Sequence, residues 1–239
     1  MLSVQARATL KTEMQRRITE TERGRFIDTL YPDEGPVRRE LYPKHMEFYA
    51  AGVEHQERAI IASNRSGKTL AVCYEATCHM TGIYPPWWAG RRFSRPVTVW
   101  AAGEDTKSVR ESLQEKLFGP PGAHGTGLIP KTAIAGVTAR SGVPEAIDSA
   151  MIRHPKGLSR LVLKVYESGR EAFQAAKIDI MLFDEEPPVA IYSEGLTRTI
   201  STVPGEPSGI VICAFTPLKG LSGLVLSYMP GGERKEGAL

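Results

Sequence analysis

The feature that most constrains the fold of this 239-residue chain is an eight-residue stretch, Ala62-Ser63-Asn64-Arg65-Ser66-Gly67-Lys68-Thr69. A short apolar run at residues 59–61 precedes it, and an apolar run at residues 70–74 follows it. The stretch matches the phosphate-binding pattern G-x-x-x-x-G-K-[ST] at every fixed position except the first, where Ala62 replaces glycine. We therefore expect a strand, a tight loop and a helix, in an α/β fold that binds a nucleotide.

The chemistry of phosphate binding explains the residue types in this loop. A helix N-terminus offers a concave set of backbone N–H groups together with the positive end of the helix dipole. Gly67 lets the backbone approach the anion, Lys68 reaches the outer phosphates, and Thr69 offers a hydroxyl to Mg²⁺. The expected nucleotide-binding set is Ser63, Asn64, Arg65, Ser66, Gly67, Lys68 and Thr69. The alternative is a surface turn that precedes an ordinary helix.

A second polar cluster follows an apolar run at residues 178–183, in the order Asp184-Glu185-Glu186. ATP hydrolysis needs a metal ion and an activated water, and acids at the end of a strand can serve both. We assign Asp184 to the metal site and Glu185 to the water as catalytic base. A polar strand end would be the simpler interpretation of these acids in isolation, but a phosphate loop upstream on a separate strand argues against it.

Hydrophobic patterning predicts strands and helices in alternation, which indicates a mostly parallel sheet with helices on both faces. Asp105 is expected to cap a helix with apolar positions at Val109, Leu113 and Leu117, and Pro43 to begin a short helix. Residues 120–145 are expected to be mostly loop. The expected strands are 59–61, 96–102, 147–154, 158–167, 178–184 and 209–215, and further helices are expected over 69–80 and 192–202.

Three parts are expected along the chain: an N-terminal helical arm over residues 1–30, the nucleotide-binding domain over 31–228, and a linker or tail over 229–239. In such a sheet, ligands lie at the carboxyl ends of the strands, where the loop, Asp184, Glu185 and Thr216 all fall. The loop over residues 84–92 contains Trp87 and Trp88 beside arginines. This loop could stack on bases or pack on phosphates. We prefer the alternative that it covers the sheet edge.

Composition sets only broad limits on function. The chain is 41% hydrophobic and 24% charged with a net charge of +3, which neither indicates nor excludes binding to nucleic acid. The three cysteines, Cys73, Cys78 and Cys213, lack metal-ligand spacing and are expected to be reduced thiols. The sequence contains no signal peptide and no apolar run near the roughly 20 residues that a membrane span needs.

Three motifs together resemble the ATPase domain of the large terminase subunits of tailed bacteriophages, which are genome-packaging motors. They are the loop 62–69, the segment Gly169-Arg170-Glu171-Ala172-Phe173-Gln174 followed by Asp184-Glu185-Glu186-Pro187-Pro188, and Phe215-Thr216-Pro217. The resemblance extends from about Tyr42 to about Tyr228. It implies a P-loop NTPase of the additional-strand type that drives double-stranded DNA into a procapsid.

The resemblance also implies roles for single residues. Lys68 and Thr69 match the phosphate and Mg²⁺ positions, Asp184 the metal-site acid, and Glu185 the catalytic base. Thr216 matches the motif that couples hydrolysis to movement. His45 stands where the family often carries a glutamine that reads adenine. The chain differs from the family at Ala62 and His45.

Arginines are expected to complete the site. Arg65 lies in the loop and can reach its own nucleotide, whereas Arg170 lies in the segment where related motors carry an arginine that acts on the neighbouring subunit. Gln174 is the nearer match to that position by spacing, and a surface ion pair of Arg170 with Glu167 or Glu171 is the alternative.

The resemblance further implies ATP and Mg²⁺ as cofactors, and double-stranded DNA, a portal protein and a small terminase subunit as partners. The resemblance also implies a homo-oligomeric ring when the chain is assembled on the portal and a monomer in isolation. It places the protein in the cytoplasm of the infected bacterial host. The chain is too short for the nuclease domain of full-length relatives, so we expect no nuclease activity. A helicase-like DNA-dependent ATPase is the first alternative, and a nucleotide sensor without turnover, disfavoured by Glu185, is the second.

Overall fold

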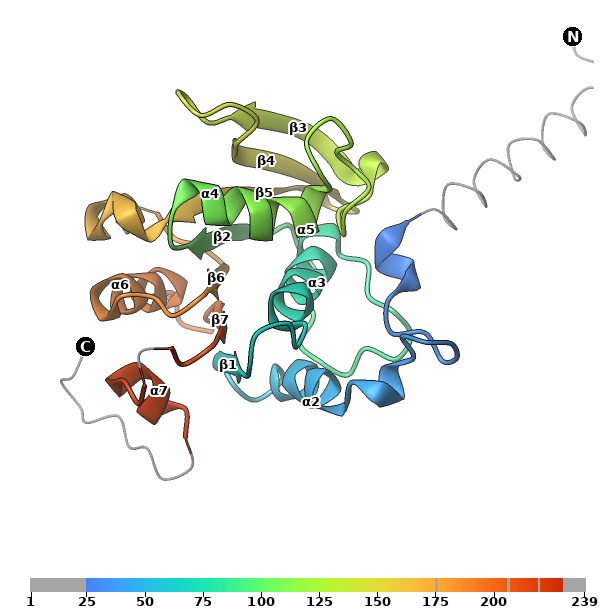
Figure 1. Cartoon of the computed structure of the whole chain (residues 1–239), viewed down its shortest axis with the longest axis horizontal. Coiled ribbons are helices and arrows are strands. Elements are labelled where there is room, and N and C mark those ends of the chain that lie inside the picture. Colours follow the sequence, from blue (N-terminus) through green and yellow to red (C-terminus); the bar gives the residue numbers. More distant parts are fainter. Residues whose placement is uncertain (1–24, 175, 206, 219, 230–239) are drawn as a thin grey trace, which may run out of the picture.

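A computed structural model of the chain describes residues 25–174, 176–205, 207–218 and 220–229 (Figure 1). Its centre is a seven-stranded sheet with the order β1-β7-β6-β2-β5-β4-β3. The first five strands in this order, β1, β7, β6, β2 and β5, are parallel to one another. The last two, β4 and β3, extend the sheet in antiparallel fashion. The strands are β1 (Glu57–Ile61), β2 (Thr98–Gly103), β3 (Ile134–Ala139), β4 (Ile147–His154), β5 (Gly157–Val165), β6 (Ile180–Asp184) and β7 (Ile210–Phe215).

The position of β7 defines the type of sheet. It lies between β1, which leads into the phosphate loop, and β6, which carries the acids. This inserted strand is the mark of an additional-strand P-loop fold, and it confirms the expected fold class. Every residue of β6 and β7 is buried, as is typical of parallel strands covered on both faces.

Helices cover both faces of the sheet (Figure 1). One core joins α3 to one side of the strands through residues such as Ala101, Leu182 and Ile212, and a second core joins α6 to the alternate residues, such as Met181 and Cys213. The helices are α2 (Pro43–Ala51), α3 (Lys68–Thr81), α4 (Thr106–Val109), α5 (Glu115–Phe118), α6 (Val189–Thr199) and α7 (Gly223–Ser227). Short 3₁₀ helices are η1 (Phe26–Thr29), η2 (Arg39–Leu41), η4 (Lys131–Ala133), η5 (Tyr166–Ser168) and η6 (Arg170–Phe173).

Local signals fix several helix ends, of which those at Pro43 and Asp105 were predicted. Pro43 occupies the first turn of α2. Asp105 caps α4, where its carboxylate accepts a hydrogen bond from the Ser108 N–H at 2.8 Å. Gly82 ends α3 with a left-handed φ of 67°, which glycine adopts without strain. Helix α4, which Asp105 caps, continues through a π-helical turn, η3 (Arg110–Gln114), into α5.

Other elements differ from the sequence-based expectation. Residues 134–139 were expected in a loop, but they form β3 and pair with β4, because the free edge of the β4–β5 hairpin supplies hydrogen bonds to a segment that contains the β-branched residues Ile134, Val137 and Thr138. Helix α6 begins at Val189, three residues before the expected start. Helix α7 was not expected. Most of the expected arm over residues 1–30 and the tail beyond Met229 lie outside the described residues, and the three-part division of the chain stays a prediction.

The tryptophan loop has the structural role that we preferred, although it packs on helices rather than on the sheet edge. Trp88 is 4% exposed, and its ring centre lies 4.9 Å from that of Tyr49 in α2. Trp87 stacks on Tyr74 of α3 at 6.1 Å. The three cysteines are all buried. Within the described ranges, no helix has the length and hydrophobicity required to cross a membrane.

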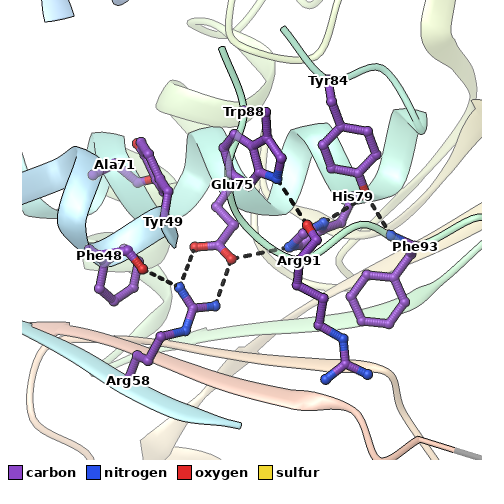
Figure 2. A network of polar contacts seen from close by, with 10 residues as sticks. All are labelled: Phe48, Tyr49, Arg58, Ala71, Glu75, His79, Tyr84, Trp88, Arg91 and Phe93. Atoms are coloured by element: carbon purple, nitrogen blue, oxygen red, sulfur yellow. Dashed lines mark hydrogen bonds and ion pairs between the residues drawn. The ribbon is translucent and has the colours of Figure 1, made fainter. Parts of the chain in front are cut away.

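A buried polar network ties α3 to β1 and to this loop (Figure 2). The Arg58 guanidinium donates to both Glu75 carboxylate oxygens, at 2.6 and 3.1 Å, and to the Phe48 carbonyl at 2.7 Å. His79 lies 3.2 Å from the Glu75 carboxylate through Nε2 and 2.9 Å from the Tyr84 hydroxyl through Nδ1. The helix that follows the phosphate loop is therefore fixed to the sheet by charge as well as by packing.

Candidate active site

The phosphate loop connects β1 to α3 at the carboxyl edge of the sheet, as expected. Arg65 and Gly67 have left-handed φ angles of 64° and 83°, and α3 begins at Lys68. Arg65 is exposed. A methyl group on Gly67 would lie 3.3 Å from His45 Cε1, so glycine allows His45 to cover the loop as well as allowing the turn.

Lys68 and Thr216 meet in this site although 148 positions separate them in the sequence. The Lys68 ammonium lies 2.8 Å from the Ser63 carbonyl and 2.9 Å from Thr216 Oγ1. Thr216 Oγ1 also lies 3.0 Å from the Ala62 carbonyl and 2.8 Å from Asn64 Oδ1. The threonine expected to couple hydrolysis to movement thus touches the loop lysine directly.

Asp184 ends β6 and is held by two hydroxyl groups. Thr69 Oγ1 donates to Asp184 Oδ1 at 2.6 Å, and Ser112 Oγ donates to Asp184 Oδ2 at 2.7 Å. Burial raises the pKa of the Asp184 carboxyl above its usual value, while the bonds from Thr69 and Ser112 act to lower it. The hydroxyl and carboxylate expected at the metal site are therefore side by side.

Glu185 follows Asp184 with a left-handed φ of 65°, which is uncommon for a residue with a side chain. Its N–H donates to the Ala214 carbonyl at 2.8 Å, and the Tyr166 hydroxyl lies 3.0 Å from the carbonyl oxygens of both Asp184 and Glu185. Burial and the neighbouring Asp184 raise the pKa of the Glu185 carboxyl, although a bond from the Thr216 main chain opposes this. A carboxyl with a raised pKa is a better proton acceptor, as a general base requires.

A pocket of about 410 Å³ opens beside these acids. Glu186 Oε2 is buried and has no hydrogen-bond partner among the described residues. Because Glu185 and Thr216 both line the pocket, it lies next to the phosphate loop, at a position suited to water and cations. Its walls are Glu104, Tyr166, Glu167, Glu185, Glu186, Pro188, Thr216 and Leu218.

His45 packs against the loop from α2. Its Nδ1 lies 2.9 Å from the Tyr31 hydroxyl, and Tyr42 stacks on its ring with 5.5 Å between ring centres. Burial lowers the pKa of His45, although a hydrogen bond with the Ser66 main chain opposes this. A neutral imidazole beside the loop can offer a donor or an acceptor to a base.

Arg170 has a different ion-pair partner from those expected. Arg170 in η6 pairs with Glu194 of α6 at 2.9 Å, rather than with Glu167 or Glu171 as the sequence-based alternative had it. Arg198 binds the same carboxylate at 2.5 Å. The Arg170 side chain remains 60% exposed, so it is accessible to another molecule while it keeps this partner.

Sequence reasoning missed Ser112 and Tyr166. A serine in the middle of a helix and a tyrosine at a strand end carry no motif, and their contacts with Asp184 and Glu185 arise only from folding. No signal in the sequence could have found them, because the adjacency of β2 and β6, which carries the helix after β2 past the end of β6, is known only from the structure.

The oxygen donors suit a magnesium ion. Mg²⁺ prefers hard oxygen ligands and is usually held by one or two protein groups together with phosphate oxygens and waters. Thr69 and Asp184 supply one hydroxyl and one carboxylate. The described residues contain no cluster of three or more His, Cys, Asp or Glu side chains that could enclose a metal.

Comparison with known proteins gives two sequence matches. Residues 59–232 match the family model of the N-terminal part of the terminase large subunit, T4likevirus type. The large terminase subunit of Salmonella phage P22 is 32% identical over 216 residues, which cover 82% of this chain and 42% of that protein. The chain thus spans less than half the length of this relative.

Among solved structures, similar chains include a mutant of the ATPase domain of the large terminase of Thermus phage P74-26 and the large terminase of another thermophilic bacteriophage. The first has a TM-score of 0.49 and 17% identity, covering 84% of this chain and 74% of that one. The second has a TM-score of 0.48 and 14% identity, and the match covers 73% of this chain and 37% of that one. The family model and the P22 relative decide between a terminase and a helicase-like protein: the chain belongs to the family of phage terminase large subunits and corresponds to its N-terminal part.

Proposed function

We propose that this chain is an ATP-hydrolysing motor domain that powers the translocation of double-stranded DNA into a viral procapsid. The observation that carries the proposal is the meeting of three strand ends at one site. There Lys68 touches Thr216 and Thr69 touches Asp184, with Glu185 adjacent. Phosphate-binding, metal-binding and base groups within one constellation are what ATP hydrolysis requires.

The roles follow from the contacts. The loop over residues 63–67 binds the phosphates through backbone N–H groups, and Lys68 exchanges its bonds to Ser63 and Thr216 for phosphate oxygens. A Mg²⁺ ion held by Thr69 and Asp184 would neutralise charge that develops on the phosphates. Glu185 accepts a proton from the attacking water. Because Lys68 and Thr216 share a hydrogen bond, a lysine that moves to phosphate releases Thr216, which links the nucleotide to the segment after β7.

We propose that two arginines complete the catalytic site. Charge builds on the γ-phosphate oxygens in the transition state, where an arginine contributes about 10³–10⁵ in rate. Arg65 lies in the loop and acts on its own nucleotide. Arg170 is exposed and acts on the nucleotide of a neighbouring subunit, in a ring that assembles on a portal protein in the cytoplasm of the infected host. A small terminase subunit is a further partner, and isolated chains are monomers with low activity.

Phosphate release with and without double-stranded DNA tests the proposal. We expect hydrolysis that DNA stimulates, and we expect Lys68→Ala to abolish it and to weaken ATP binding, because the ammonium charge at the phosphates is lost. Lys44→Ala, which alters an exposed lysine of α2, is the matched control. Turnover by Lys68→Ala at the rate of the unmodified protein would contradict the assignment of the site.

Subunit mixing tests the action of Arg170 on a neighbour. Arg170→Ala subunits keep an intact nucleotide site, and Glu185→Gln subunits keep the arginine. Each alone should be inactive, and their mixture should regain part of the activity. Arg198→Ala, which removes the other arginine on Glu194, is the control for loss of the ion pair. Full activity of Arg170→Ala at every protein concentration would return Arg170 to a structural role.

A further inference from the structure

The π-helical turn η3 lies in the helix that follows β2, and it contacts both Asp184 and the start of β4. The Glu115 N–H donates to the Arg110 carbonyl, five residues earlier, whereas a regular α-helix bonds four residues earlier. Such a turn inserts one extra residue and so shifts the following side chains by about 100° around the axis. The core positions Val109, Leu113 and Leu117 recur at the four-residue spacing that this wider turn accommodates.

Ser112 lies inside this turn and uses its hydroxyl unusually. A serine within a helix commonly bonds the carbonyl four residues before it. Ser112 instead donates to Asp184 Oδ2 at 2.7 Å, while Thr69 donates to the other oxygen of the same carboxylate at 2.6 Å. Asp184 is 6% exposed, so water contributes little to its orientation. The two hydroxyls together fix the plane of the carboxylate.

Gln114, two residues later in the same turn, is 1% exposed and fixes the helix to the antiparallel part of the sheet. Its Nε2 donates to the Glu145 carbonyl at 2.8 Å, and its Oε1 accepts from the Ile147 N–H at 2.8 Å, where β4 begins. The turn is therefore anchored on one side by the start of β4 and on the other by Asp184. A displacement of this anchor would move Ser112 relative to the carboxylate.

We propose that Ser112 is a positioning residue for the metal site, and that Gln114 keeps the π-helical turn in the register that lets Ser112 act. Ser112 orients Asp184 so that the oxygen facing Thr69 stays directed at the hydroxyl that Mg²⁺ needs. The inference rests on the proposed ATPase function and adds two residues that act through Asp184.

The test measures the effect of Mg²⁺ on nucleotide binding, which requires no turnover. The dissociation constant of a fluorescent ATP analogue is determined with EDTA and across a Mg²⁺ titration, for the unmodified protein, Ser112→Ala and Ser112→Thr. Ser193→Ala, a helical serine that bonds only the Val189 carbonyl, is the matched control. The apparent KM for Mg²⁺ in ATP hydrolysis is measured in parallel.

We expect Ser112→Ala to bind the analogue normally in EDTA but to need about 10–100-fold more Mg²⁺, as is typical when a group that orients a metal ligand is removed. Ser112→Thr retains a hydroxyl and should restore most of the Mg²⁺ response. Equal Mg²⁺ dependence of Ser112→Ala and Ser193→Ala would overturn the proposal. Failure of the unmodified protein to bind the analogue would instead overturn the ATPase assignment, and this inference with it.

A double-mutant cycle tests the role of Gln114. Gln114→Met keeps the length of the side chain and removes both hydrogen bonds, so we expect a raised Mg²⁺ requirement that does not add to that of Ser112→Ala. Gln114→Glu keeps the acceptor for Ile147 and replaces Gln114→Met if the latter does not fold. Additive effects, or a normal Mg²⁺ requirement in the folded variant, would show that Gln114 does not act through Ser112.

Discussion

Glu185 combines a strained backbone with a raised side-chain pKa. Its left-handed φ is held by the bond from its N–H to Ala214 and by the Tyr166 hydroxyl, which binds the carbonyls on both sides of the turn. Strain held in place by buried contacts directs the carboxylate into the pocket beside the phosphate loop. The position of the side chain is thus set by residues from η5 and β7 as well as by β6.

Glu185→Gln removes the proposed base and leaves the shape of the site. We expect ATP and Mg²⁺ binding to persist while kcat falls by about 10²–10⁴, the usual contribution of a general base. Glu54→Gln, at an exposed glutamate after α2, is the matched control and should retain most of the activity. If Glu185→Gln loses Mg²⁺-dependent binding while Asp184→Asn keeps it, the two acids have exchanged roles.

At the scale of elements, α3 connects the phosphate loop to the core of the sheet. Its first turn supplies the loop lysine and threonine, and its centre carries Glu75 and His79 in the buried network (Figure 2). Burial raises the pKa of Glu75, but the charge of Arg58 and the bonds from His79 and Arg58 outweigh it, so the pKa lies below its usual value. The carboxylate is therefore charged and paired at neutral pH.

Removal of one partner from this pair should be costly. Glu75→Leu leaves the Arg58 guanidinium buried without its counterion, and we expect the free energy of unfolding to fall by about 3–5 kcal/mol. Because an apolar pair of similar volume avoids this penalty, the double variant Arg58→Met, Glu75→Leu should lose much less than the sum of the single changes. Urea denaturation measures all three proteins, and strictly additive losses would contradict the coupling.

For the whole molecule, buried histidines make stability depend on pH, and His79, at 0% exposed, is the most deeply buried of those that the structure describes. Burial lowers the pKa of His79 below 6.5, while Glu75 opposes this. The unfolded chain therefore binds a proton near pH 6.5 that the folded chain binds only at lower pH. By linkage, the free energy of unfolding rises with pH through this window and falls as the solution is acidified below about 6.5.

His79→Gln retains groups for Glu75 and Tyr84 but does not titrate, so the loss of stability between pH 6.5 and 5 should be smaller than in the unmodified protein. His55→Gln alters an exposed histidine and serves as the control. Denaturant unfolding at a series of pH values gives the slopes. An unchanged slope in His79→Gln would show that this histidine is protonated equally in both states.

The sequence by itself determined the elements that depend on neighbouring residues. The phosphate loop, the Asp105 cap and the apolar strands were all predicted, because backbone propensity and hydrophobic periodicity act over a few positions. The identity of Lys68, Thr69, Asp184, Glu185 and Thr216 as candidate residues also came from the sequence. The distances between their side chains did not, because a motif specifies residue types rather than geometry.

The tertiary structure decided what lies beside what. The placement of β7 between β1 and β6 brings Thr216 to Lys68, and the placement of β2 beside β6 brings Ser112 to Asp184. The pairing of β3 with β4 made a strand of residues 134–139, and the exposed Arg170 pairs with Glu194 instead of its sequence neighbours. The physical reason is common to all these cases: strand order and long-range contacts depend on the free energy of the whole core, which no short segment contains.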